Sequence, residues 1–338
     1  MSTSSLPTRQ IGNDNVTALG FGAMGIGGLA YGSNVGDHET RFKVLDRLVE
    51  LGCTNWDTAD IYANSEELIG NWFKKTDKRD QIFLATKFGI TRTGPCGTPE
   101  YVKQQIAQSL QRLGVDTIDL YYVHRIDPTV PIETTMNALV ELVNAGKIRY
   151  IGLSEPSPAT LRRAHKIHPV AAIQVEYSPF VLDIEQRGHL LDTARELGVA
   201  VVAYSPLGRG FITGQITSHA DLPSDDFRRD IPKYSEENFP AILSLIKKLK
   251  AFGEKYNATA SQITLAFMLA QGDDIIPIPG TKSIKYAEEN LGALKIKLSP
   301  EDIKAIRRAI TEAEIPGDQY PAAYMKALYA DTPELPKA

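Results

Sequence analysis

The sequence predicts an α/β protein, a (β/α)8 TIM barrel with an N-terminal β-hairpin and a long loop after the seventh strand. Two observations predict this fold. Short apolar runs alternate with segments of helical pattern along most of the 338 residues, and eight such runs can be counted. Most of the runs are continuously apolar, as is typical of parallel strands buried on both faces. Eight successive strand–helix units favour a closed barrel over an open doubly wound sheet.

The predicted elements follow one another in that order. Residues 8–12 and 16–21 form the hairpin, because the tight-turn sequence Asn13-Asp14-Asn15 joins them. The predicted barrel strands are 18–23, 53–57, 82–87, 118–124, 150–154, 172–176, 199–204 and 275–278. The predicted helices are 65–75, 98–112, 132–145, 158–166, 187–197, 284–294 and 300–312. Pro99 behind Thr98 indicates one helix start, and Gly146 indicates one helix end.

Two segments interrupt this alternation. Residues 206–240 are long, polar and rich in Gly, Asp and Arg, and they predict a functional or mobile loop. Residues 315–338 contain four prolines and three tyrosines without a helical period. No repeat or linker divides the chain. We therefore predict a single domain over 1–338, with the barrel at about 16–313 and a tail on the substrate side at 314–338.

Composition narrows the class of protein. The formal net charge is -4, which argues against a nucleic-acid-binding scaffold. The two cysteines form neither a disulfide framework nor a CxxC metal pair, and the six histidines form no HxH pair, so we predict no metal. No apolar stretch approaches the ~20 residues that span a bilayer. The N-terminus lacks the apolar core of a signal peptide. We expect a cytoplasmic protein that binds a small molecule, with no nucleic-acid or membrane partner and with a homo-oligomer left open.

Polar residues end three consecutive predicted strands. Asp57, Lys87 and His124 stand at these ends, and Tyr62 follows Asp57 by five residues. In a barrel, the carboxyl ends of the strands carry the chemistry. Each residue alone has an ordinary structural explanation, such as a helix cap or a solvated lysine. Their coincidence on three neighbouring strands indicates an active site.

These residue types can make a proton donor. A free tyrosine has a pKa of ~10 and donates poorly at neutral pH. We expect the Lys87 ammonium to lower the pKa of Tyr62, and Asp57 to keep the buried lysine charged. His124 would hydrogen-bond a carbonyl oxygen and orient it. The set is a general acid with its tuning groups, and it contains no nucleophile–base pair.

The sequence resembles the aldo-keto reductase family nearly from end to end. The matching segments are 19–25 (LGFGAMG), 56–62 (WDTADIY), 119–124 (DLYYVH), 146–154 (GKIRYIGLS), 174–179 (QVEYSP), 203–210 (AYSPLGRG) and 278–282 (IPGTK). The family's catalytic tetrad of Asp, Tyr, Lys and His falls on Asp57, Tyr62, Lys87 and His124. Within the family, the segments most resemble the bacterial, fungal and plant branch that includes pyridoxal reductases and broad aldehyde reductases. The resemblance implies NADPH-dependent reduction of aldehydes or ketones.

The resemblance also implies a cofactor site. The residues that it implicates are Gly22, Met24, Asp57, Ser154, Gln174, Tyr204, Ser205, Pro206, Leu207, Gly208, Arg209, Gly210, Gly280, Thr281, Lys282, Tyr286, Glu289 and Asn290. Ser154 and Gln174 would hold the nicotinamide carboxamide and Tyr204 would stack on the ring. The loop 205–210 would bind the pyrophosphate, and Lys282 the adenosine 2′-phosphate.

Two positions depart from the family pattern. Glu155 replaces an Asn that usually follows the serine, and a carboxylate accepts hydrogen bonds but cannot donate them. Tyr286 replaces an Arg found in many members, which weakens the preference for NADPH over NADH.

By position, four residues line the predicted substrate pocket: Tyr31, Phe88, His124 and Arg125. The tail tyrosines Tyr320 and Tyr324 are further candidates. Arg125 fits either an anionic substrate group or a salt bridge to Asp127 or Glu155, and the sequence leaves these alternatives open.

Other functions explain the sequence less well. Residues 20–25 match GxGxxG, but no helix opens there and no acid follows at the spacing of a dinucleotide fold. The YxxxK pattern of short-chain reductases is absent. The remaining rival is a cofactor-binding sensor or regulatory subunit with little turnover, because channel auxiliary subunits resemble the same family and keep the tetrad.

Overall fold

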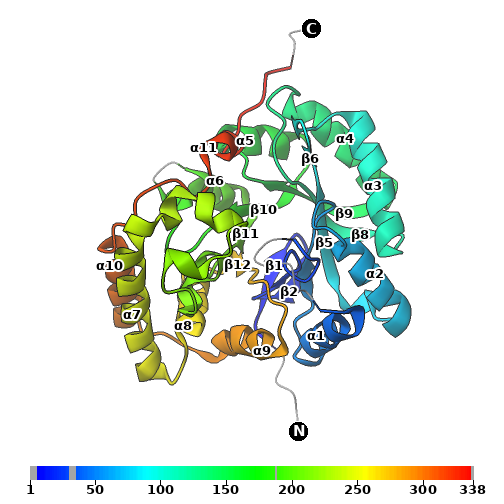
Figure 1. The fold of residues 1–338 in the computed structure, drawn as a ribbon. Helices are drawn as coiled ribbons and strands as arrows, with labels where there is room; N and C mark the ends of the chain where they lie inside the picture. Colours follow the sequence, from blue (N-terminus) through cyan, green and yellow to red (C-terminus); the bar gives the residue numbers. More distant parts are fainter. Residues whose placement is uncertain (1–5, 30–35, 187–188, 336–338) are drawn as a thin grey trace.

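A computed structural model describes residues 6–29, 36–186 and 189–335. Eight parallel strands form one sheet in the order β12-β11-β10-β9-β8-β5-β4-β3. The strands are β3 (Phe21–Gly22), β4 (Asn55–Asp57), β5 (Phe83–Phe88), β8 (Ile118–Val123), β9 (Ile148–Ser154), β10 (Val170–Glu176), β11 (Ala200–Tyr204) and β12 (Ile275–Pro277). The sheet curls around a central axis, and helices surround it (Figure 1).

The barrel closes between its first and last strands. Gly22 forms a parallel bridge with Gly280, and the backbone N–H of Gly20 donates to the carbonyl of Pro277 over 2.9 Å. A Cβ at Gly22 would lie 2.8 Å from the carbonyl oxygen of Ile278, so the two chains can approach only without a side chain there. This closure confirms the predicted (β/α)8 barrel.

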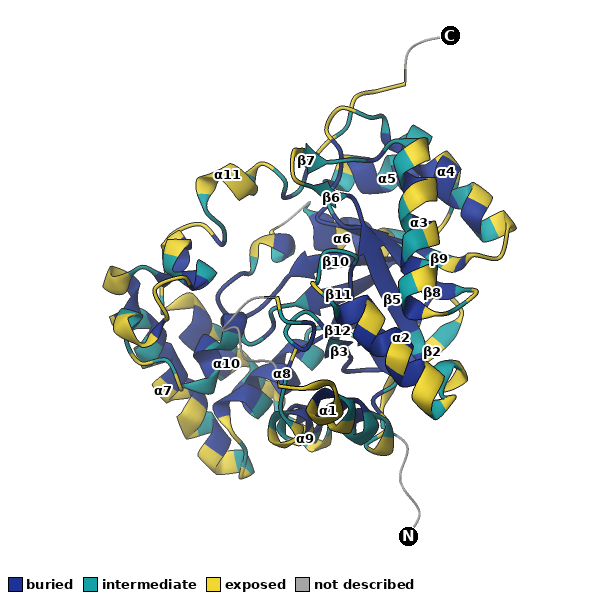
Figure 2. Ribbon diagram, turned by 45° about the vertical axis from the view of Figure 1, so that its right-hand side comes forward, coloured by how far each residue is buried: buried dark blue, intermediate teal, exposed yellow. Residues whose placement is uncertain are grey.

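Helices pack on the outside of the sheet with their buried faces inward and their exposed faces toward solvent (Figure 2). They are α1 (His38–Glu50), α2 (Ser65–Thr76), α3 (Pro99–Leu113), α4 (Ile132–Asn144), α5 (Pro158–Ile167), α6 (Leu190–Leu197), α7 (Phe239–Tyr256), α8 (Ala260–Leu269), α9 (Ile284–Gly292) and α10 (Pro300–Thr311). The predicted start of α3 is confirmed, because the Thr98 side chain accepts from the N–H of Tyr101 and Pro99 opens the helix.

Two hydrophobic cores follow from the alternation of side chains along each strand. The larger core lies between sheet and helices, and the smaller one fills the barrel. The N-terminal hairpin of β1 (Thr8–Ile11) and β2 (Asp14–Thr17) contributes Ile11 and Val16 to the inner core. The predicted hairpin is present, and it closes the barrel at the end opposite the carboxyl ends of the strands. Along β5, Ala85 faces the inner core, whereas Leu84 and Phe88 belong to the outer one.

The predicted long loop follows β11. It contains only short 3-10 turns, from η3 (Gly208–Thr213) to η7 (Glu236–Asn238), before α7 begins. The C-terminal tail packs on it, since the N–H of Lys233 donates to Asp318 O over 3.1 Å and Asn238 Nδ2 donates to Pro316 O over 3.0 Å. The tail then forms the short helix α11 (Ala322–Met325).

A small hairpin of β6 (Ile90–Thr91) and β7 (Gly94–Pro95) interrupts the connection from β5 to α3. The tail returns to the barrel end through a parallel bridge between Ala330 and Pro156. Among the described helices, none is long and apolar enough to cross a membrane.

Candidate active site

The four predicted catalytic residues meet at the carboxyl ends of β4, β5 and β8. Lys87 Nζ donates to Asp57 Oδ1 and, over 2.7 Å, to the carbonyl oxygen of Thr58. The same ammonium lies 3.5 Å from the Tyr62 hydroxyl. The rings of Tyr62 and His124 pack edge to face with centroids 5.6 Å apart. One lysine therefore contacts both the carboxylate behind it and the phenol in front of it.

The ion pair at the base of this group is buried. The Lys87 side chain is fully buried and Asp57 nearly so. Burial raises the pKa of Asp57 and lowers that of Lys87, and the attraction between the two charges opposes both shifts. Gln174 Nε2 supports the carboxylate with a 2.7 Å bond to Asp57 Oδ2. The pair holds the ammonium in one position beneath Tyr62.

The pKa of Tyr62 departs from our expectation. Burial, followed by the charge of Asp57, raises the pKa of Tyr62 above its ordinary value. Arg125 is the cation whose charge opposes this shift. The expectation of a lowered pKa was wrong because it paired Lys87 with Asp57 but left out the burial of the phenol, which disfavours the phenolate. Tyr62 is therefore a protonated phenol at neutral pH, and it holds its proton more tightly than a free tyrosine does.

His124 is buried between cations. Burial, with the charges of Lys87 and Arg125, lowers the pKa of His124 well below its ordinary value. A neutral imidazole carries one N–H donor and one acceptor nitrogen. Within the described part of the chain, Nδ1 is buried and has no hydrogen-bond partner. His124 is thus a neutral polar group that faces Tyr62.

Three residues predicted for the nicotinamide lie at or near the carboxyl ends of β9, β10 and β11. Ser154 ends β9 and Tyr204 ends β11, while Gln174 lies within β10. Ser154 and Gln174 are buried, whereas Tyr204 is partly exposed. A hydroxyl and an amide can satisfy both the donor and the acceptor of a carboxamide. This donor set beside an aromatic ring fits a nicotinamide.

The loop after β11 begins with an unusual backbone. Ser205, Gly208, Arg209 and Gly210 all have positive φ. Turns of this kind expose backbone N–H groups to an anion. The Arg209 side chain, however, is buried in an ion pair, with Nη2 2.6 Å from Glu176 Oε2. The structure therefore brings the loop backbone to the mouth and ties the arginine to β10.

The residues predicted for the adenosine end gather where the last strand meets the first. The bridge between Gly22 and Gly280 joins the two loops, and the Lys282 stem lies 3.9 Å from the Cβ position of Gly25. Met24, on the first of these loops, is partly buried, while Thr281 and Asn290 are buried.

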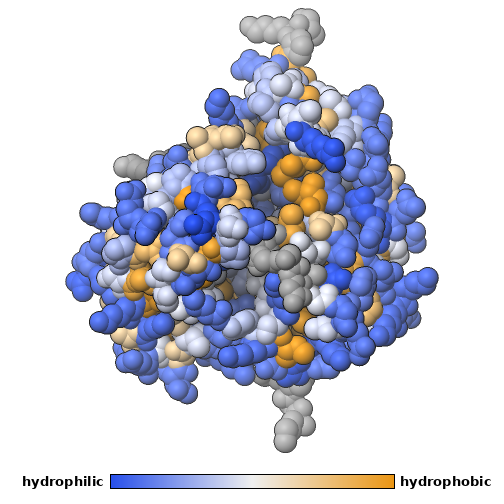
Figure 3. All heavy atoms as spheres, in the orientation of Figure 1, coloured by the Kyte–Doolittle hydropathy of each residue, from blue (hydrophilic) through white to orange (hydrophobic). Residues whose placement is uncertain are grey.

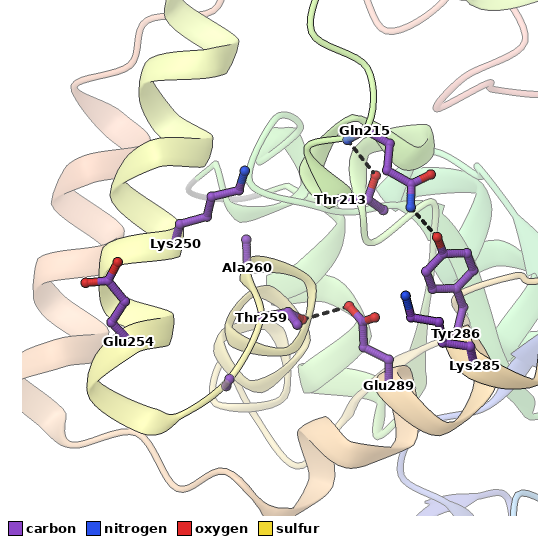
Figure 4. Close-up of a pocket in the computed structure, with 10 residues that line it drawn as sticks. Thr213, Gln215, Lys250, Glu254, Thr259, Ala260, Lys285, Tyr286 and Glu289 are labelled. Atoms are coloured by element: carbon purple, nitrogen blue, oxygen red, sulfur yellow. Dashed lines mark hydrogen bonds between the residues drawn. The ribbon is translucent and has the colours of Figure 1, made fainter.

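An open pocket of about 350 Å³ lies beside α9 (Figure 4). Tyr286 and Glu289 line it together with Lys285 and Lys250. Gln215, from the loop after β11, donates to the Tyr286 hydroxyl, and Thr259 donates to Glu289 over 2.7 Å. Its lining is therefore of mixed charge, because Glu254 joins Glu289 alongside the two lysines.

The structure places only some of the predicted substrate residues at the mouth of the barrel. Tyr31 lies outside the described residues. Phe88 is fully buried and stacks on Tyr121 with centroids 5.0 Å apart, because it faces outward on the strand where Lys87 faces inward. The structure therefore does not bring Phe88 to the mouth. Arg125 does lie at the mouth, together with Tyr320 from the tail. Figure 3 shows apolar residues around a depression near the centre of one face.

Glu155 follows Ser154 and is fully buried with a left-handed backbone. Its Oε1 accepts from the Tyr204 hydroxyl and from the N–H of Glu176, both over 2.9 Å. Among described residues, its Oε2 has no partner. Burial raises the pKa of Glu155 from 4.5 to about 7. Glu155 therefore positions the tyrosine that ends β11.

This shift predicts a pH effect on stability. Between pH 4.5 and about 7 the folded carboxyl keeps its proton and an unfolded one loses it. Protonated Glu155 therefore contributes to the free energy of unfolding at low pH, and this contribution is lost as the pH rises. In the wild type the free energy of unfolding should fall between pH 5 and pH 8, and Glu155→Gln should make this fall smaller by up to about 3 kcal/mol. Denaturant unfolding at the two pH values measures the fall, and the same fall in the variant and the wild type would contradict the prediction.

Sequence reasoning missed several groups at this site. The carbonyl of Thr58 and the carboxylate of Glu176 had no recognisable pattern, because their partners come from distant segments. Tyr320 was only a positional candidate, although its hydroxyl lies 3.1 Å from that of Tyr204. A tyrosine in an aperiodic tail was the available signal.

Comparisons with known proteins identify the family of the chain. Residues 18–311 match the Aldo/keto reductase family. The chain is 58% identical to aldo-keto reductase str7 of Strobilurus tenacellus, covering 98% of this chain and 99% of that one. It is 49% identical to aldo-keto reductase yakc [NADP(+)] of Schizosaccharomyces pombe, covering 98% and 100%.

A solved glycerol dehydrogenase from Gluconobacter oxydans superimposes with a TM-score of 0.82 at 26% identity, covering 94% of this chain and 98% of that one. A thermostable aldo-keto reductase in complex with epalrestat superimposes with a TM-score of 0.72 at 30% identity, covering 90% and 100%. The chain belongs to the aldo/keto reductase family, and it is an oxidoreductase of carbonyl and alcohol groups.

Proposed function

We propose that this protein is an NADPH-dependent reductase that converts aldehydes or ketones to alcohols, with Tyr62 as the general acid. The arrangement of Lys87 carries the proposal. Its ammonium is bound to Asp57 and lies 3.5 Å from the Tyr62 hydroxyl, so the phenol stands over a fixed cation. Such a pair stabilises the phenolate that forms when the proton leaves.

Each residue of the catalytic four has its own role in the reaction. When bound, the reduced nicotinamide supplies a hydride to the carbonyl carbon. Tyr62 gives its proton to the carbonyl oxygen, the phenolate takes a proton back from solvent, and the alcohol leaves. Neutral His124 orients the oxygen toward Tyr62. Lys87 offsets the charge that develops on Tyr62, and Asp57 keeps Lys87 charged.

The residues present fit this cofactor. Ser154 and Gln174 would hold the carboxamide, Tyr204 the ring, and the backbone of 205–210 the pyrophosphate. Lys282, beside the loop that holds Gly25, would favour the phosphate that distinguishes NADPH from NADH. The fission-yeast relative carries NADP(+) in its name, which supports the same choice.

Turnover separates this proposal from a cofactor-binding sensor. We expect the wild-type protein to oxidise NADPH in the presence of aldehydes, followed at the nicotinamide absorbance band. The panel includes pyridoxal, because of the branch that the sequence resembles, and 4-nitrobenzaldehyde as a reactive general probe. Tight NADPH binding without turnover of any aldehyde would contradict the proposal and favour the sensor.

Tyr286 predicts an adjustable cofactor preference. An arginine at this position would add a planar fork that pairs with phosphate, where tyrosine offers only a hydroxyl. We expect Tyr286→Arg to raise the kcat/KM ratio of NADPH to NADH about tenfold. Tyr286→Phe, which removes only the hydroxyl bound by Gln215, is the matched control. An unchanged ratio in the arginine variant would place the 2′-phosphate elsewhere.

A further inference from the structure

Arg125 is a cation at the mouth of the barrel, and its hydrogen-bond partners among the described residues are all uncharged. Its Nη1 donates to the carbonyl of His124 over 2.7 Å and to Ser154 Oγ over 3.1 Å. Its Nη2 lies 3.5 Å from the hydroxyls of Tyr204 and Tyr320. The side chain is partly exposed, so a ligand can reach it.

The two acids that the sequence offers as partners of Arg125 accept hydrogen bonds from other groups. Asp127 accepts from the N–H of Gly97 over 2.9 Å and from that of Thr129 over 2.8 Å. Glu155 holds Tyr204 and the backbone of β10 through Oε1, and the Arg125 charge lowers the pKa of Glu155 against the effect of burial. Within the described ranges, no carboxylate lies within 4.0 Å of the guanidinium. Neither of the salt bridges left open by the sequence forms, which leaves the anionic substrate group.

The position of Arg125 relates it to the reaction. It follows His124 directly and contacts Ser154 and Tyr204, so it borders both the proton donor and the predicted nicotinamide site. The Arg125 charge lowers the pKa of Tyr62, against the effect of burial. The tail adds Tyr320, whose hydroxyl lies 3.5 Å from the same Nη2 that approaches the Tyr204 hydroxyl, and the two hydroxyls are 3.1 Å apart. The cation thus lies beside His124, next to one tyrosine of β11 and one of the tail.

We propose that Arg125 binds the carboxylate of the substrate, and that the natural substrates are aldehydes or ketones that carry a carboxylate. This inference rests on the proposed reductase function and names its substrate class. A guanidinium binds a carboxylate through two parallel N–H bonds, and such charge-assisted bonds are about twice as strong as neutral ones. The three hydroxyls around Arg125 lower the cost of its burial without neutralising its charge, so it keeps its attraction for an anion.

A pair of matched substrates tests the inference. 4-Carboxybenzaldehyde and 4-formylbenzamide have the same shape and differ in charge. We expect the wild type to prefer the acid by about tenfold or more in kcat/KM. Arg125→Met, which keeps the length of the side chain, should bring the ratio of acid to amide close to one. Arg125→Lys should keep part of the preference, because it retains the charge without the fork. Using a ratio within each variant cancels any general loss of activity.

Two controls separate the inference from its alternatives. Arg92 is exposed on the hairpin turn near the same mouth, so Arg92→Met removes an equal charge outside the site. A preference lost in Arg92→Met as well would mean long-range steering and would overturn the inference. Binding of 4-methylbenzoate to the NADP+-loaded protein, measured by calorimetry, needs no turnover. It should weaken about tenfold or more in Arg125→Met.

The outcomes distinguish this inference from the proposed function. If the wild type reduces acid and amide equally, Arg125 does not select carboxylates, although the reductase stands. If no aldehyde is reduced, the reductase fails, and the calorimetry still decides whether Arg125 holds an anion. Equal binding of 4-methylbenzoate by the wild type and Arg125→Met would overturn the inference in either case.

Discussion

Tyr62→Phe is expected to lower kcat by about 100-fold or more. The variant keeps the ring that packs against His124 and loses only the hydroxyl that lies 3.5 Å from Lys87 Nζ. NADPH binding should remain nearly unchanged, because none of the groups predicted to hold the cofactor is altered. Steady-state kinetics with 4-nitrobenzaldehyde measures the first effect, and quenching of protein fluorescence by NADPH measures the second.

The matched control for this variant is Tyr324→Phe. Tyr324 is 57% exposed on the tail, so the same chemical change occurs outside the barrel. Its kcat should stay within about twofold of the wild type, as for most surface substitutions. Turnover of Tyr62→Phe at the wild-type rate would show that another group or solvent supplies the proton.

Lys87→Met is expected to cost both stability and activity. Removing the ammonium leaves Asp57 buried without its counter-charge, and breaking a buried pair in this way costs about 3–5 kcal/mol. The phenolate on Tyr62 would also lose its stabilising cation, so kcat should fall by about 100-fold or more. Urea unfolding measures the free energy of unfolding, and steady-state assays measure kcat.

The double variant Asp57→Asn with Lys87→Met separates the two effects. It removes both charges, so much of the lost stability should return while the activity does not. If Lys87→Met were as stable as the wild type, the two groups would not form a charged pair in the folded protein. If the double variant regained turnover, the lysine would not support Tyr62.

The barrel was predictable because its strands are short apolar runs that end in polar residues. The predicted strand 82–87 became β5 at Phe83–Phe88, within a residue at each end. The helix α8 was missed because residues 263–268 are buried all round and show no amphipathic period. The helix α1 does bury Val44, Leu45 and Leu48 at helical spacing, so its signal was present and was not used.

The candidate site, like the fold, was predictable only in part. Asp57, Lys87 and His124 were predictable because strand ends are recognisable in the sequence and meet at one edge of a barrel. The uncharged surroundings of Arg125 could not be predicted, because they come from β9, β11 and the C-terminal tail. Tyr320 in that tail is 195 residues away from Arg125 in the sequence. The pKa of Tyr62 was predicted in the wrong direction because burial and the Asp57 charge are properties of the folded site.

The most direct test of the proposed reduction follows deuterium from NADPH to the alcohol. The wild-type protein is incubated with 4-nitrobenzaldehyde and NADPH that carries deuterium at both C4 positions, and the alcohol is analysed by mass spectrometry. We expect one deuterium on the former carbonyl carbon, because NADPH would transfer its hydride to that carbon while both are bound beside Tyr62. Alcohol formed without deuterium at that carbon, or no alcohol at all, would contradict the proposed reduction.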